Sequence, residues 1–368
     1  CGVIKMGNAR NLGSFLGNNT SLSTINDAYD AGTLVPSSTN PSVILNGDMR
    51  VAQRGTSFTS PGQAVYTLDR WMSGMQTTTG TITVTQDTDV PTASEAGYQF
   101  TNSLKIDVTT ADTSIAAGDR TSMIYRVEGK NIAHAGFGQA GVRYMTLSFW
   151  HKHTKTGTHS VSIQNNDRNR GYPIEYTQTA TDTWEKAELT FPVDTTGTWL
   201  TTTGIGIQIY FSIAMGTNYS ATANTWQALT SYAATGTVNN LDSTSNNMLF
   251  TGVKLELGSE ATDFQHISYG EELAKCQRYY FKSSTMATSF ADATSPSYTF
   301  RGKRYAKHSL PTIMRANPSV TAIQHAANYS GGVTVNGERD YVYLAPSSTT
   351  QLSGTLYWYG GFTADADI

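Results

Sequence analysis

The sequence predicts an all-β protein: a β-sandwich, followed by a smaller C-terminal β domain and preceded by an extended N-terminal arm. Between Val43 and Gly258, short runs alternate apolar and polar residues with period two, which is typical of half-buried strands. Only 14% of the 368 residues are charged, and Ser and Thr make up about a quarter of the chain, well above ordinary usage. Because β-branched Thr suits a pleated surface, this composition favours sheet over helix.

The middle of the chain contains enough strand-like runs to close a sandwich or barrel by itself. The clearest runs cover 81–85, 103–108, 123–127, 144–150, 159–163, 184–191, 205–211 and 248–257. Many short strands without long helices are typical of these two architectures. The connection over 216–247 is long and polar, and loops of this length are often functional or cover a sheet edge.

Three regions follow from these patterns. Residues 1–40 contain few apolar side chains and form an arm and linker, with one short helix expected over Ser23–Asp30. Residues 41–275 form the sandwich, which ends at a helix opened by a Ser268–Glu271 capping box. Residues 276–368 form the second β domain. Its strand-like runs cover 277–282, 298–300, 319–323, 332–335, 341–344 and 356–359.

Net charge and hydropathy argue against nucleic acid and membrane partners, and the cysteine count argues against disulfides. A net charge of -3 lacks the basic excess that phosphate binding requires, so we expect no nucleic acid partner. No stretch approaches the roughly 18 apolar residues of a membrane span, so we expect no membrane insertion. Cys1 and Cys276 are the only cysteines, and we expect both to be free thiols. Because the chain starts with Cys1 rather than Met, we expect truncation or processing at its N-terminus, and the sequence does not decide whether Cys1 is the true terminus.

Several motifs, in a fixed order, resemble a family of bacteriophage virion proteins: tail or head fibres and related appendages. This family carries a jelly-roll domain similar to carbohydrate-binding modules. The resemblance runs from about residue 40 to the C-terminus. The motifs lie at 46–55, 69–71, 148–150, 184, 197–199, 225–227, 253–258, 269–280 and 363–367.

The resemblance implies a function as well as a jelly-roll fold. It implies a homotrimeric structural fibre protein that is assembled in the host cytoplasm, exposed on the virion surface, and joined to other virion proteins through its N-terminal arm. We expect it to attach reversibly to a host cell-surface polysaccharide. A purely structural capsid-decoration, collar or tail component is the alternative, and a polysaccharide depolymerase is a third. The resemblance fixes neither head nor tail location, nor the host or its glycan.

Sugar binding requires flat aromatic faces together with planar amide, guanidinium or carboxylate groups. The segment 165–172 combines these groups in one loop after a strand, although its acidic and basic side chains could instead pair with each other. Two further tryptophans lie outside the runs expected to form the core, one in the long polar loop and one near the C-terminus. The candidate ligand-binding residues are Asp167, Arg168, Arg170, Tyr172, Trp226 and Trp358.

The remaining tryptophans, Trp71, Trp150, Trp184 and Trp199, lie in or beside strands and are expected in the core. His151 and His153 alternate on one strand with His159 nearby, so they form either a metal site or, more simply, a solvated strand edge.

We expect no cofactor, although a structural calcium ion is left open because related sandwiches hold one through oxygen ligands. Asp107, Asp263 and Glu256 are too scattered to define such a site.

No catalytic motif is evident, and we expect no enzymatic activity. A glycosidase needs two converging carboxylates, and no spacing pairs the acidic residues of this chain. One basic cluster occurs near the C-terminus and is expected to be a solvated face, a subunit seam or a contact for an anionic glycan. It consists of Arg301, Lys303, Arg304, Lys307 and His308.

Overall fold

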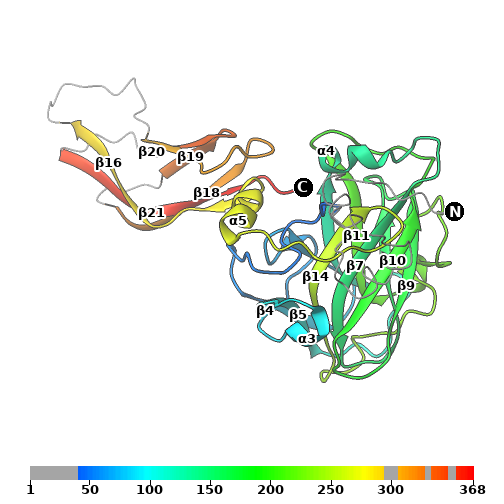
Figure 1. The fold of residues 1–368 in the computed structure, drawn as a ribbon. Helices are drawn as coiled ribbons and strands as arrows, with labels where there is room; N and C mark the ends of the chain where they lie inside the picture. Colours follow the sequence, from blue (N-terminus) through cyan, green and yellow to red (C-terminus); the bar gives the residue numbers. More distant parts are fainter. Residues whose placement is uncertain (1–39, 294–305, 328–332, 347–353) are drawn as a thin grey trace, which may run out of the picture.

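The computed structural model describes residues 40–293, 306–327, 333–346 and 354–368. Within these ranges the chain folds into a large β-sandwich and a smaller C-terminal β unit, with short helices only (Figure 1). The predicted all-β class is confirmed. The helix expected at 23–30 and the strand expected at 298–300 lie outside the described residues. None of the helices within the described ranges is long and apolar enough to cross a membrane.

The sandwich consists of two antiparallel six-stranded sheets. In spatial order, the first sheet contains β1 (Ser57–Thr59), β4 (Thr81–Asp87), β5 (Ser103–Thr110), β14 (Asn247–Leu257), β7 (Tyr144–His153) and β10 (Glu185–Pro192). The second contains β2 (Val65–Tyr66), β3 (Trp71–Gln76), β6 (Arg120–Glu128), β11 (Ile205–Met215), β8 (Gly157–Gln164) and β9 (Gly171–Gln178). All eight runs singled out between residues 81 and 257 are strands.

The two ends of the sandwich segment meet. The Val43 amide donates to the Leu255 carbonyl and the Val253 amide donates to the Gly47 carbonyl, both at 2.9 Å. A side chain at Gly47 would place a Cβ 2.1 Å from the Val253 carbonyl oxygen, so only glycine allows this approach.

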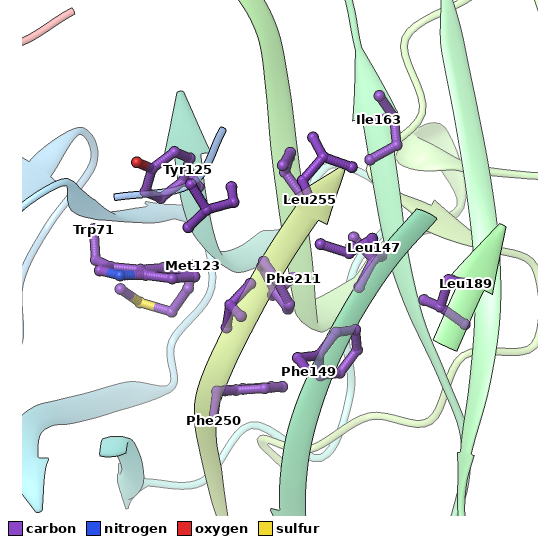
Figure 2. Packing of buried hydrophobic residues seen from close by; sticks show 14 of the residues in the cluster. Trp71, Met123, Tyr125, Leu147, Phe149, Ile163, Leu189, Phe211, Phe250 and Leu255 are labelled. Carbon is purple, nitrogen blue, oxygen red and sulfur yellow. The ribbon is translucent and has the colours of Figure 1, made fainter. Parts of the chain in front are cut away.

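The core lies between the two sheets and is rich in aromatic rings (Figure 2). The Phe149, Phe211 and Phe250 rings come from both sheets, with centroids 5.3 to 6.0 Å apart. Trp71 is 1% exposed and packs against Phe211 at 5.5 Å. Trp150 is also buried, whereas Trp184 and Trp199 are half-buried.

The short helices lie at the edges of the sandwich and in its connections. They are α3 (Ala93–Ala96), α4 (Gly129–Ile132), η1 (Ala133–Ala135), η2 (Thr217–Tyr219) and α5 (Tyr269–Gln277). The predicted capping of α5 is present, since the Glu271 amide donates to the Ser268 hydroxyl oxygen. Cys276, a free thiol, is buried in this helix.

The C-terminal unit has a second, separate hydrophobic cluster that includes Leu310, Met314 and Phe362. One sheet is built around β21 (Gly354–Asp365), which pairs with β15 (Tyr280–Lys282), β16 (Met286–Ala293) and β18 (Ser319–Ala327). The other sheet contains β17 (Ala306–Ser309), β20 (Tyr341–Pro346) and β19 (Val333–Gly337).

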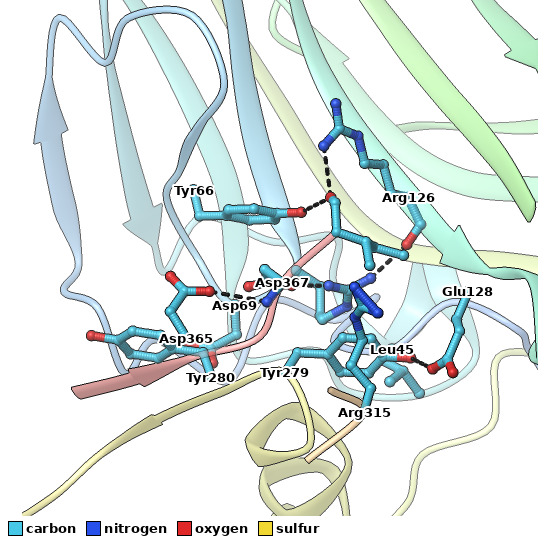
Figure 3. A network of polar contacts seen from close by, with 12 residues as sticks. Leu45, Tyr66, Asp69, Arg126, Glu128, Tyr279, Tyr280, Arg315, Asp365 and Asp367 are labelled. Atoms are coloured by element: carbon cyan, nitrogen blue, oxygen red, sulfur yellow. Dashed lines mark hydrogen bonds and ion pairs between the residues drawn. The ribbon is translucent and has the colours of Figure 1, made fainter. Parts of the chain in front are cut away.

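The last residues of the chain return to the sandwich and end in a buried ion cluster (Figure 3). Arg70 and Asp367 form an ion pair with both side chains 2% exposed, and Arg54 bonds the same carboxylate at 2.8 Å. The Arg70 guanidinium also lies 3.7 Å from the Tyr279 ring centroid. Burial alone would lower the pKa of Arg70, but the Asp367 carboxylate raises it. This cluster joins the C-terminal unit to the sandwich.

Replacing Asp367 with alanine leaves a buried guanidinium without its counter-charge. We expect the free energy of unfolding to fall by roughly 3 to 5 kcal/mol, measured by urea denaturation of the full chain. The exposed pair Lys186–Glu188, joined at 2.7 Å, provides the control, and Glu188→Ala should cost less than about 1 kcal/mol. Equal effects from the two substitutions would contradict the structural importance of the cluster.

His151, His153 and His159 form a buried row and not the solvated edge considered from the sequence, since each is at most 1% exposed. Neighbouring ring centroids are 5.1 and 4.4 Å apart. A ring nitrogen of each bonds a protein group, namely Gln178 Oε1, the Tyr176 hydroxyl and the Lys155 carbonyl, respectively. Among the described residues, no group of three His, Cys, Asp or Glu side chains is arranged to hold a metal ion.

This row makes stability depend on pH. Burial lowers the pKa of His151 and of His159 from 6.5 to about 4. The unfolded chain therefore binds protons between pH 6.5 and 4 that the folded chain does not, and stability falls as the pH decreases through this window. We expect a loss on the order of 2 kcal/mol per histidine by pH 4.5, measured by urea denaturation.

Carboxylates titrate mostly below this window, and proton NMR of the imidazole signals separates the two contributions. The signals of the buried histidines should remain those of neutral rings down to about pH 5. Titration of all three rings near pH 6.5 would contradict a buried, neutral row.

Candidate ligand-binding site

The segment singled out for sugar binding is a tight turn between β8 and β9. The Asn165 side-chain oxygen accepts from the Asn169 and Arg170 amides at 3.1 and 3.2 Å. Arg168 adopts the left-handed conformation, with a φ of 56°. Asp167 and Arg168 are exposed. The turn therefore orders its backbone internally and presents Asp167, Arg168 and the neighbouring Asn169 to solvent.

Arg170 pairs with a carboxylate, as the simpler interpretation of this loop anticipated, but the partner is Asp194. The Arg170 Nε and Nη2 atoms lie 2.6 and 3.0 Å from the two Asp194 oxygens, a two-point ion pair. This geometry fixes the turn against the connection that follows β10. It leaves Arg170 with a structural role in the present arrangement.

Tyr172 differs from the expectation of an exposed stacking ring, because it is only 5% exposed. β9 begins at Gly171, so period-two alternation turns the next side chain toward the core. Its ring packs 5.2 Å from that of Trp226, and the Trp226 indole N–H donates to the Pro192 carbonyl at 2.7 Å. Trp226 is half-buried against the core. These rings close one end of the sandwich.

The predicted residue Trp358 lies in β21, and its side chain is outside the described residues.

The candidate calcium ligands do not converge. Glu256 pairs with Lys254 at 3.2 Å, and Asp107 lies 3.3 Å from Lys105. Of the basic cluster, Lys307 is described and stacks on the Tyr341 ring at 3.9 Å, while 301–305 lie outside the described residues.

An open pocket occurs instead on the outer face of the second sheet. Along β6, Met123, Tyr125 and Val127 point into the core, so the alternate residues Ser122, Ile124 and Arg126 point outward. Outward residues of three neighbouring strands form the floor of the pocket. They are Met72 and Gly74 of β3, Ser122 and Ile124 of β6, and Tyr210 of β11.

The long polar connection 216–246, which the sequence predicted to be functional or to cover a sheet edge, covers part of this outer face and forms one wall of the pocket. The Ser162 hydroxyl, on the outer side of β8, donates to the Ser231 carbonyl at 2.5 Å. The Tyr232 ring then packs 4.4 Å from that of Tyr210. The opposite wall comes from Gln63 and Ala64, before β2. The enclosed space, part of it open to solvent, is about 290 Å³.

Three arginines line the pocket: Arg120, Arg126 and Arg168. We call this site the arginine pocket. Arg120 donates to the Tyr232 hydroxyl at 2.8 Å. In the amide orientation that satisfies both of its partners, Gln63 accepts from Arg120 at 3.0 Å. Arg126 donates to the Gln208 side chain at 3.2 Å and to the Ile368 main-chain oxygen at 2.7 Å. None of these partners is an Asp or Glu side chain.

The ionisation states of the pocket follow from burial. Burial raises the pKa of Tyr210, so its hydroxyl stays protonated at neutral pH. For Arg168, burial alone would lower the pKa, whereas hydrogen bonding to Tyr232 raises it. Among the described residues, no Asp or Glu side chain lies within ion-pair distance of the three arginines. The pocket is therefore a cluster of cationic and neutral hydrogen-bond donors.

Of the candidates chosen from the sequence, Arg168 alone lines this pocket. Arg120 and Arg126 were missed, although a signal was present. They lie six residues apart in a period-two strand and hence on the same face, which a strand with only one buried face exposes. The contribution of Gln63 and Tyr232 depends on how two distant loops fold over the sheet, which local patterns do not specify.

Comparison with known proteins gives similarity at the level of structure only. No protein-family model matches the chain, and no curated protein matches it. The tailspike protein 4 enzymatically active domain of bacteriophage CBA120 is 14% identical, with a TM-score of 0.29. That match covers 55% of this chain and 21% of the tailspike chain, so this chain spans about a fifth of the tailspike's length.

Two sugar-related structures are similar over a comparable share of this chain. A Bacteroides thetaiotaomicron protein to which sugar binding is ascribed is 11% identical, with a TM-score of 0.34. That match covers 59% of this chain and 100% of the Bacteroides chain. A family 11 carbohydrate-binding module of Clostridium thermocellum is 10% identical, with a TM-score of 0.27. That match covers 54% of this chain and 94% of the module. Because sandwich folds support many unrelated functions, likeness at this level assigns no ligand to this chain.

The burial of Tyr172 generates a test of its role. We expect Tyr172→Ala to lower the free energy of unfolding by roughly 3 kcal/mol, because it removes a buried ring from the cluster with Trp226. Tyr172→Phe keeps the ring and should change the unfolding free energy by less than about 1 kcal/mol. A Tyr172→Ala protein as stable as the parent would instead point to a surface role for the ring.

Proposed function

We propose that this protein is a structural component of a phage virion, a fibre or related appendage, that binds a host cell-surface polysaccharide reversibly. The observation that carries the binding part is the arginine pocket. It is open and lined by several convergent donors on a rigid sheet, which is the usual form of a small-ligand site. The phage part rests on the resemblance of the sequence motifs to virion fibre proteins.

The chemistry of the pocket suits a sugar. Guanidinium, amide and hydroxyl groups from Arg120, Gln63 and Ser122 can hold ring hydroxyls in fixed directions. Its space of about 290 Å³ includes open solvent, so the pocket is a shallow recess and does not enclose a whole sugar ring. We therefore propose that it contacts one edge of a single sugar residue, whose neighbours in the glycan chain lie along the outer face of the sheet.

We propose binding without catalysis. Glycoside hydrolysis needs a pair of carboxyl groups, about 5 to 9.5 Å apart, on either side of the bond. The residues that line the pocket include neither Asp nor Glu. Binding alone is therefore the simpler function for this site, and no cofactor is needed for it.

Each pocket taken alone would bind weakly, since it is small and open. A homotrimer with three such sites on one fibre would gain avidity, because the second and third contacts form at a high effective concentration. We propose this arrangement with attachment to the virion through residues 1–40. A glycan-free role in capsid decoration, a collar or a tail is the second candidate, favoured by the internal hydrogen bonding of the 165–170 turn.

Binding of the purified chain to host-type cells and a glycan array, with mass determination in solution, tests this proposal. We expect a saturable signal that Arg168→Ala reduces about tenfold, because its guanidinium is the most exposed of the three. The neighbouring Asp167→Ala, which does not line the pocket, is the matched control and should bind like the parent. A stable trimer that binds neither cells nor any glycan would favour the purely structural alternative.

A further inference from the structure

Several other arginines of the described chain pair with a carboxylate side chain, whereas the three in the arginine pocket have no Asp or Glu partner. Arg70 pairs with Asp367, Arg170 with Asp194 and Arg278 with Glu128. In each case a carboxylate lies within ion-pair distance. Arg120, Arg126 and Arg168 instead share one pocket, and in the part of the chain that the structure describes none of them forms an ion pair with an Asp or Glu side chain.

This imbalance is unfavourable without a ligand. Arg120 and Arg126 are half-buried, so they have lost part of their hydration, and like charges that share a pocket repel each other. Neutral oxygens such as the Tyr232 hydroxyl orient a guanidinium but do not neutralise it. An anion in the pocket would remove the repulsion and bind through charge-assisted hydrogen bonds, which are stronger than those between neutral groups.

The contacts also leave donors unused. A guanidinium has five N–H groups, and Arg120 directs one at Tyr232 and one at Gln63. The Tyr232 ring packs at a tilt against the Tyr210 ring of the pocket floor, with centroids 4.4 Å apart, and this contact holds the wall formed by the connection in place. Planar guanidinium groups match the two oxygens of a carboxylate, and also those of a sulfate. The aromatic and aliphatic lining, including Ile124 and Met72, suits the carbon skeleton to which such a group is attached.

We infer that the arginine pocket binds an acidic sugar residue, one that carries a carboxylate or sulfate, with the anionic group held by Arg120 and Arg168. This inference rests on the proposed function and specifies its ligand class. Arg126 would act as the third cation, held in place by Gln208 and the Ile368 main-chain oxygen. Uptake of the anion therefore depends on residues from both the sandwich and the end of the chain.

The test is isothermal titration of the full chain with oligosaccharides in matched charged and neutral forms. The panel contains hexuronate oligomers with their methyl esters, and sulfated oligomers with their desulfated forms. We expect at least one charged form to bind tenfold or more tightly than its neutral partner, because charge-assisted contacts are lost in the latter. The affinity should also fall as NaCl is raised from 50 to about 300 mM.

Variants locate the effect. Arg120→Gln and Arg168→Gln should each weaken the charged form about tenfold and leave the neutral form within about twofold. Arg143→Gln is the matched control, since Arg143 is half-buried, donates to the Gly136 carbonyl at 3.1 Å and lies outside the pocket. It should leave both affinities unchanged.

The outcomes separate this inference from the function on which it rests. Charged and neutral forms that bind equally would overturn the acidic class while leaving glycan binding in place. Sodium sulfate that binds as tightly as the sulfated oligomer would show a site for free anions and would also overturn a sugar ligand. Failure of every charged and neutral oligomer to bind would overturn both proposals.

Discussion

The structure depends on the alternation of side chains along β6 and β11, the two central strands of the second sheet. One row of residues, including Tyr125 and Phe211, fills the core between the sheets. The other row, including Arg126 and Tyr210, faces outward and forms part of the arginine pocket. Because the period of a strand is fixed at two, a shift of one residue in register would exchange the two rows. Core packing thus holds the pocket residues in place.

The C-terminal unit is connected to this pocket through the last residues of the chain (Figure 3). Asp367 is held by Arg54 and Arg70, and the next residue, Ile368, accepts from Arg126, which lines the pocket. Glu128 on the same strand bonds Arg278 at 2.9 Å. The position of one pocket cation therefore depends on how the two parts of the molecule are joined. The buried ion cluster therefore affects the position of Arg126 as well as the stability of the fold.

The sequence allowed more of the fold than of the site to be predicted. Alternating runs identified the strands because half-buried sheets impose period two, and the Ser268 cap marked α5 because capping is a local interaction. The site depends on contacts between distant segments. Tyr172 was assigned to a loop since nothing local shows that β9 begins at Gly171. Arg170 was expected to contact ligand or a nearby acid, and its partner Asp194 comes from another connection. Tyr232 reaches the pocket only because its loop folds over the sheet.

We propose that a sugar binds on the outer face of the second sheet, at the arginine pocket. The most direct measurement is a crystal structure of the full chain soaked with an oligosaccharide that binds it in solution. We expect electron density for one sugar residue at the pocket, with oxygens within about 3.2 Å of the Arg120 and Arg168 guanidinium groups. Density elsewhere, for example beside Trp226 or on the face of the first sheet, with the pocket empty, would contradict it.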